Sequence, residues 1–159
     1  MFLGCSETGP TAPVVSDDNQ TPASLGKIAI TKFEGKSQTI LLHDPGTSTP
    51  LPGGYVLDRG IVVETRDELD DPRVNGNVVW VVNDILDAEG YGKLWGTGEL
   101  IIPDVGYWEM KYVGWLTAEG LTYEVGGKGR GGLEGSIAHW TYVRTAPSQF
   151  DVVGFIIER

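Results

Sequence analysis

The sequence has little cysteine, histidine and basic charge, and each shortage excludes a class of protein. Its single cysteine, Cys5, allows neither an intrachain disulfide nor a cysteine-based zinc site. The two histidines, His43 and His139, are far apart and have no partner at a metal-ligand spacing, so we expect no metal and no cofactor. The longest apolar runs, such as Val78 to Val82, are too short to span a bilayer.

Basic residues are also outnumbered, with 12 Lys and Arg against 22 Asp and Glu and a net charge of −10. Such a surface repels phosphate backbones, so we expect no nucleic-acid partner and attribute the acidity to solubility. Glycine is abundant, at 23 residues of 159, and β-branched and aromatic residues dominate the apolar runs. This mixture favours strands and tight turns over helices.

The pattern of apolar runs and turn residues predicts eight or nine strands. They are 27–33, 38–43, 59–66, 77–83, 93–102, 106–117, 121–125, 135–144 and 152–158. Turn residues separate them, namely Asp44-Pro45-Gly46, Pro52-Gly53-Gly54, Asn75-Gly76, Pro103-Asp104 and Glu119-Gly120. We therefore expect residues 26–159 to form a single antiparallel β-barrel of about eight strands, with a β-sandwich as the alternative.

Two strands indicate which side chains face the core. In 106–117, Trp108, Met110 and Tyr112 alternate with polar residues, which predicts one buried and one exposed face. In 77–83 both faces are apolar, which predicts a strand covered on both sides.

The first residues, Met1-Phe2-Leu3-Gly4-Cys5-Ser6, resemble the end of a bacterial lipoprotein signal, in which the cysteine becomes lipidated. Gly4 and Cys5 match that pattern well, and Phe2 and Leu3 match it less well. The following polar residues, to about 25, have the composition of a flexible tether. The resemblance implies an exported protein whose only membrane contact is a lipid anchor on Cys5, at the outer membrane if the cell is Gram-negative.

A glycine-rich stretch, Gly126 to Gly132, contains a formal G-x-G-x-x-G at Gly127, Gly129 and Gly132. A phosphate cradle of that type needs a following helix, but Leu133 to Ile137 indicates a strand, so we interpret the stretch as a flexible hairpin. The overlapping run Gly129-x-Gly131-Gly132-Leu133-Glu134-Gly135, preceded by Trp95-Gly96-Thr97-Gly98 and followed by Trp140-Thr141-Tyr142, resembles the final hairpins of allene oxide cyclase-like and dirigent-like β-barrels. The resemblance covers about 90–144 and implies a barrel that holds an apolar substrate, as in a cyclase or isomerase.

Polar and aromatic side chains in the strands supply the candidate site. Glu99 and His139 are the candidate catalytic residues, because a polar group facing a barrel interior would be desolvated. The acidic stretch Asp67 to Asp71 lacks the order of a calcium loop and is interpreted as a solvated loop. The many aromatic residues in the strands are typical of a site for an apolar ligand. The candidate ligand-binding residues are Trp80, Trp95, Trp108, Met110, Tyr112, Tyr123 and Trp140.

Three functions follow from these features. The first is an exported, lipid-anchored barrel that binds a small apolar ligand or a surface protein. The second is a barrel cyclase or isomerase acting on an apolar substrate. The third is a structural or assembly lipoprotein. A ligand or substrate requires an accessible cavity with convergent polar groups, which a structure can reveal.

Overall fold

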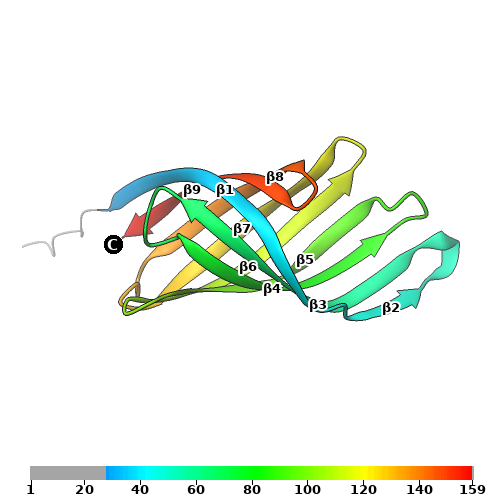
Figure 1. Cartoon of the computed structure of the whole chain (residues 1–159), viewed down its shortest axis with the longest axis horizontal. Coiled ribbons are helices and arrows are strands. Elements are labelled where there is room, and N and C mark those ends of the chain that lie inside the picture. The colour runs from blue at the N-terminus through cyan, green and yellow to red at the C-terminus, as the bar shows by residue number, and fades with distance from the viewer. Residues whose placement is uncertain (1–27, 159) are drawn as a thin grey trace, which may run out of the picture.

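Nine antiparallel strands form one continuous sheet in the computed structural model, which describes residues 28–158 (Figure 1). The strands are β1 (Ala29–Asp44), β2 (Thr47–Pro50), β3 (Val56–Leu69), β4 (Gly76–Leu86), β5 (Gly92–Ile102), β6 (Gly106–Thr117), β7 (Gly120–Gly131), β8 (Ile137–Ala146) and β9 (Gln149–Glu158). A short 3-10 turn, η1 (Pro52–Gly54), is the only helical element among these residues. None of the described helical elements is long and apolar enough to cross a membrane. The lipobox and tether predicted for residues 1–25 lie outside the described residues.

Pairing of β1 with β3 closes the sheet into a barrel of eight strands, with β2 as an extra strand on the edge of β3. The order is β1-β9-β8-β7-β6-β5-β4-β3, and every pairing is antiparallel. Closure gives β1 and β3 a hydrogen-bonding partner on the sides where the eight-stranded sheet would otherwise end. The predicted barrel is confirmed, and the alternative of a sandwich is excluded.

Aromatic side chains fill the interior, and several of them pack over glycines on neighbouring strands. A Cβ added at Gly98 would lie 2.4 Å from the Trp80 ring, and one at Gly127 would lie 2.6 Å from the Trp140 ring. The Trp108 and Trp140 rings meet edge to face with centroids 5.6 Å apart. Glycine on these strands therefore supplies the space that the large rings occupy.

One end of the barrel is closed by the loops between β3 and β4 and between β7 and β8. Val74 and Leu133 from these loops are buried in the core. The Trp108 indole Nε1 donates a hydrogen bond of 2.6 Å to the Arg73 carbonyl oxygen. The Arg73 guanidinium pairs with Asp71 and with Glu158 on β9, at 2.6 and 2.8 Å, which holds the loop across this end.

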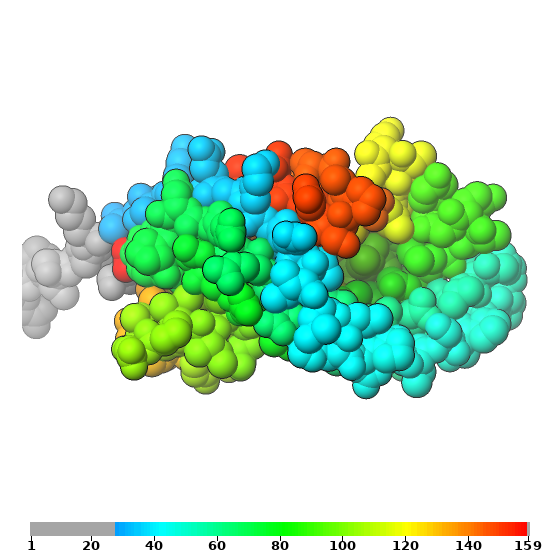
Figure 2. All heavy atoms as spheres, viewed as in Figure 1, coloured from blue at the N-terminus to red at the C-terminus, as the bar shows by residue number. Residues whose placement is uncertain are grey.

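The opposite end is open. Here β2 and the β4–β5 and β6–β7 hairpins extend well past the β8–β9 hairpin, so the wall of the barrel is lowest at β8 and β9 (Figure 1). In the space-filling view the molecule is hollowed beside the orange β8–β9 hairpin, between it and the cyan and green strands (Figure 2). We call this end the mouth.

Several predicted strand limits are wrong. The segments 27–33 and 38–43 belong to one strand, β1, because Glu34 to Ser37 pair with β9 on one side and, from Gly35, with β3 on the other. Strand β2 was not predicted, and β3 is longer than 59–66 at both ends. The predicted strand 121–125 covers only the first half of β7. The remaining predicted strands match observed ones to within a few residues, and the predicted turns lie in or beside the observed connections.

The glycine-rich stretch is not a hairpin. Gly126 to Gly131 are the second half of β7, paired with β6 from Gly106 to Lys111, and the turn to β8 comes after them. A hairpin was predicted because glycine is a poor strand former on an open surface, but here Gly127 accommodates the Trp140 ring. No helix follows Gly132 within the described chain, in agreement with the rejection of a phosphate cradle.

Two burial predictions are also wrong. The acidic stretch is not a solvated loop, because Asp67, Leu69 and Asp71 are buried and the first two lie in β3. Strand β4 is covered on one side only, since the outward Val79 and Val81 are exposed. The predicted alternation in β6 is confirmed, with Trp108, Met110 and Tyr112 all buried.

Candidate functional site

The mouth is lined by apolar side chains that are only partly buried. They lie at the inward positions of strands that converge on this end and pack against the core, and they are Val63, Val82, Leu94, Leu116 and Tyr123. Their partial exposure contrasts with the fully buried Trp108 and Trp140 deeper in the barrel. The interior is therefore solid at the closed end and accessible at the mouth.

Two carboxyl groups face each other at this end. Asp58 on β3 is directly opposite Asp84 on β4 in the antiparallel register. Asp84 is 7% exposed, and its Oδ1 has no hydrogen-bond partner. Burial, followed by the charge and hydrogen bonding of Asp58, raises the pKa of Asp84 to about 6. Asp58 accepts a hydrogen bond from the hydroxyl of Ser48 on β2.

A buried phenol lies close to these carboxyl groups. The Tyr112 ring crosses over Gly96, where an added Cβ would be 3.0 Å from the phenol oxygen. Gly96 is paired with Val82 on β4, two residues before Asp84. The Tyr112 hydroxyl is buried and has no hydrogen-bond partner, and burial together with the Asp84 charge raises its pKa above the ordinary value. Unpartnered buried polar atoms are rare and call for an explanation.

A layer of tyrosines connects this group to the barrel interior. Tyr123 lies between Tyr112 and Tyr142, with ring centroids 5.7 and 5.0 Å away, and is stacked on Tyr142 at an interplanar angle of 22°. Phe150 packs against Tyr123 from β9 at 5.3 Å. The layer forms an aromatic floor beneath the mouth.

The layer ends at a second buried carboxylate, Asp67, which is 1% exposed. Its Oδ1 accepts hydrogen bonds from the hydroxyls of Ser37 at 2.6 Å and Thr65 at 3.3 Å, and its Oδ2 accepts one from Tyr142 at 2.5 Å. The Thr65 hydroxyl in turn accepts a 3.0 Å bond from the Trp80 indole. Burial raises the pKa of Asp67 to about 6, although the three hydrogen bonds oppose the rise. This carboxylate is satisfied and enclosed, so we assign it a structural role.

The predicted ligand-binding residues occupy three different environments. Trp108, Met110 and Trp140 pack inside the solid core, and Trp80 is buried with its indole bound to Thr65. Tyr112 and Tyr123 are the two that lie at the mouth. Trp95 alternates with the inward Leu94 and Gly96 and lies on the outer face. The mouth is thus formed by part of the predicted set.

The predicted catalytic residues are not brought together. Glu99 is exposed on the outer face of β5. His139 lies on the outer face of β8, where it stacks on Phe155 with centroids 5.5 Å apart and pairs with Glu124 at 3.2 Å. Neither residue faces the interior that the prediction assumed.

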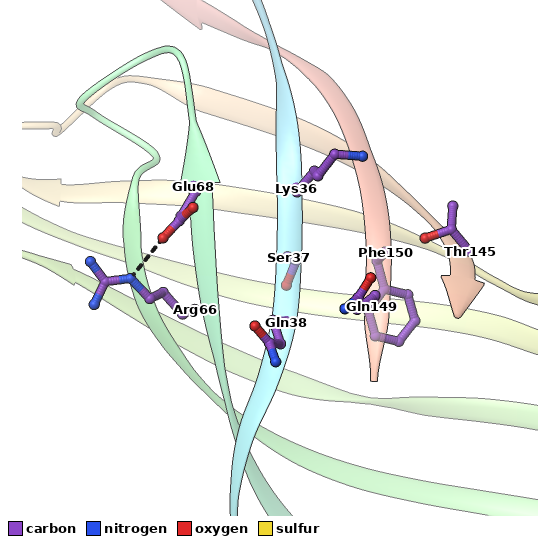
Figure 3. Close-up of a pocket in the computed structure, with 8 residues that line it drawn as sticks. All are labelled: Lys36, Ser37, Gln38, Arg66, Glu68, Thr145, Gln149 and Phe150. Carbon is purple, nitrogen blue, oxygen red and sulfur yellow. Dashed lines mark hydrogen bonds and ion pairs between the residues drawn. The ribbon is translucent and has the colours of Figure 1, made fainter. Parts of the chain in front are cut away.

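Two further hollows are present, and the first borders the tyrosine layer through Phe150. The first, of about 190 Å³, is bordered by residues of β1, β3, β8 and β9, and Figure 3 shows its charged and amide side chains around the blue β1 strand. Its rim includes Lys36, Gln38, Arg66, Glu68 and Gln149, and Arg66 is paired with Glu68 at 3.2 Å. The second is a groove on the outer face of β4 to β8, with Val79, Val81 and Ile137 among charged side chains.

Sequence reasoning missed Asp58, Asp67 and Asp84. A signal for Asp84 was present, because it continues the inward series of Val78, Trp80 and Val82 in β4. Asp67 lies between Thr65 and Leu69 in the inward series of β3, but the prediction assigned it to a loop. The pairing of Asp58 with Asp84 depends on strand register, which the sequence does not show.

Comparison with known proteins does not assign the chain to a family. No model of a known protein family matches the chain, and no curated protein matches it significantly.

Proposed function

We propose that this protein is an exported, lipid-anchored β-barrel that binds a small apolar ligand at its mouth. The observation that carries the proposal is that two unpartnered buried polar atoms, Asp84 Oδ1 and the Tyr112 hydroxyl, lie beside a partly exposed apolar lining. A third such atom in the described residues, Trp140 Nε1, lies in the core and is not part of the mouth. Small-molecule sites combine an apolar wall with a few convergent polar groups in this way. A barrel of eight strands has space for one small ligand where side chains do not fill it.

The anchor rests on the sequence. Gly4 and Cys5 match the end of a lipoprotein signal, and a polar leader separates them from the barrel. Each buried methylene of an acyl chain contributes about 0.8 kcal/mol to membrane binding, so a lipidated Cys5 would hold the barrel at a membrane surface.

Binding is tested with the neutral fluorescent probe N-phenyl-1-naphthylamine, which brightens in apolar sites. We expect saturable brightening with the unaltered protein and its loss in Leu116→Lys, which places a charge in the mouth. Val113→Lys is the matched control, because Val113 is on the same strand and exposed on the outer face. Equal brightening in both variants, or none in the unaltered protein, would contradict the proposal.

Lipidation is tested by expressing the gene with its native upstream region, with and without Cys5→Ser. We expect the unaltered protein to carry acyl mass and to partition with membranes, and the variant to do neither. An unaltered protein without acyl mass contradicts the anchor.

A second candidate function is a cyclase or isomerase acting on the apolar ligand. It is supported by a carboxyl group whose pKa is raised to about 6, beside a phenol that is free to donate a hydrogen bond. In that case Asp84 would exchange a proton with the substrate, and Tyr112 would stabilise an oxyanion. Turnover abolished by Asp84→Asn with ligand binding retained would distinguish this enzyme from a binding protein.

A further inference from the structure

The two carboxyl groups at the mouth are an uncompensated pair. Like charges directly opposite each other on neighbouring strands destabilise a sheet, and Asp58 and Asp84 occupy such positions. The ion pairs found within residues 28–158 involve other carboxylates, so neither member has a lysine or arginine partner there. The fold therefore brings two acids together at its mouth without an internal cation.

Two polar atoms at the mouth, one of them on Asp84, have no hydrogen-bond partner. Asp84 Oδ1 and the Tyr112 hydroxyl are both more than nine-tenths buried and unbonded. A carboxylate oxygen is an acceptor, and a phenol oxygen can accept as well as donate, whereas a protonated amine carries two or three N–H donors on one compact group. The chemistry that would satisfy the carboxylates and the phenol together is that of a positively charged donor.

The lining of the mouth indicates what the rest of the ligand is. Leu94 is opposite Asp84 on β5, and Leu116 and Tyr123 complete an apolar and aromatic surface around it. A metal ion would find few ligands here, because no group of three or more His, Cys, Asp and Glu side chains suited to a metal occurs in residues 28–158. Aromatic faces, in contrast, favour an organic cation.

We propose that the ligand of the mouth is an amine with an apolar body, whose ammonium group is held between Asp58 and Asp84 and hydrogen-bonds to the Tyr112 oxygen. The apolar body lies against Leu94, Leu116 and Tyr123. This inference rests on the proposed function, because it assigns a chemical class to the ligand of the same site.

The test uses calorimetric titration with 2-phenylethylamine, its neutral analogue 2-phenylethanol and calcium chloride. We expect the amine to bind at least about tenfold more tightly than the alcohol, because a buried carboxylate gains a charge-assisted hydrogen bond. Asp84→Asn is expected to weaken amine binding by at least about tenfold and to leave alcohol binding unchanged. Asp58→Asn is a second variant with the same expectation. Asp151→Asn is the control, since Asp151 pairs with Lys36 on the outer surface.

Equal binding of amine and alcohol, with no effect of either mouth variant, overturns the amine inference and leaves the apolar-ligand function standing. If 2-phenylethylamine does not bind while N-phenyl-1-naphthylamine still does, the amine inference is likewise overturned and the apolar-ligand function stands. Calcium binding that depends on Asp84 and exceeds amine binding overturns the inference in favour of a metal. Failure of every probe, the naphthylamine included, overturns both proposals.

Discussion

Asp67 joins three strands through one carboxyl group. It lies on β3 and accepts hydrogen bonds from Ser37 on β1 and Tyr142 on β8, so it spans the pairing that closes the barrel. A buried carboxylate of this kind is costly unless its hydrogen bonds are satisfied. The protonation state of this one residue therefore affects the stability of the closed barrel.

The pKa of Asp67 predicts how stability depends on pH. Because the folded pKa of about 6 lies above the ordinary 3.8, the stability that this group contributes is fully present below pH 3.8 and is lost as the pH rises through 6. Relative to Asp67→Asn, the free energy of unfolding of the unaltered protein should fall by about 2 kcal/mol between pH 4 and pH 7. Urea unfolding of both proteins at several pH values measures the difference. A difference that stays constant with pH contradicts the assignment.

Asp84 predicts a gain of stability on mutation. Asp84→Asn removes one of two like charges on opposite strands, so the unliganded protein should become more stable at pH 7 by about 1 kcal/mol. The gain should shrink toward pH 4, where Asp84 is already protonated in the folded protein. Thermal unfolding at both pH values checks this, with Asp151→Asn as control. A loss of stability at pH 7 would show that the carboxyl group has a structural partner.

At the scale of single elements, β7 shows most clearly how packing determines local structure. Gly126 and Gly127 are adjacent and face opposite sides of the barrel wall. A Cβ at Gly126 meets no atom within 4 Å, whereas one at Gly127 would lie 2.6 Å from the Trp140 ring. Only the inward glycine is required by its surroundings.

This difference predicts opposite effects of the same substitution. Gly127→Ala should destabilise the protein by about 1 to 3 kcal/mol, because the methyl group overpacks the core. Gly126→Ala should be neutral or slightly stabilising, because it only reduces the freedom of the unfolded chain. Chemical denaturation of the two variants tests the prediction. Equal losses would show that β7 does not depend on the Trp140 contact.

The same element shows what the sequence could and could not predict. Turns such as Asn75-Gly76 and Glu119-Gly120 were found because their chemistry is local, and β6 was found because its alternation is regular. The second half of β7 was missed because its glycines are explained only by rings from other strands. The mouth was found in part, through Tyr112 and Tyr123, but the carboxylates that define it come together through strand register.

For the whole molecule, the decisive feature is closure between strands that are far apart in the chain. The first ten residues of β1, Ala29 to Gln38, pair with β9, so that Ala29 is opposite Glu158. Contacts between distant residues incur loop-closure entropy before they stabilise the fold, and proteins dominated by them fold slowly. The barrel can close only after its first and last strands, β1 and β9, have been brought together.

We therefore expect cooperative folding on a timescale of about milliseconds to seconds, as in other all-β domains. Three buried tryptophans lie on three different strands, Trp80 on β4, Trp108 on β6 and Trp140 on β8, so tryptophan fluorescence reports on the packing of the core between these strands. Stopped-flow refolding from urea measures the rate, and equilibrium transitions followed by fluorescence and circular dichroism should coincide. Separate transitions would indicate that one part of the barrel unfolds independently.

The pairing of Ala29 with Glu158 also shows at which end of the barrel the described chain begins. Both residues are at the end that Val74 and Leu133 close, and the mouth is at the opposite end. A lipid anchor on Cys5 would therefore attach to the barrel at its closed end. The mouth would be the end that carries no attachment, so a ligand diffusing in the surrounding compartment would reach it without crossing the point where the tether joins the barrel.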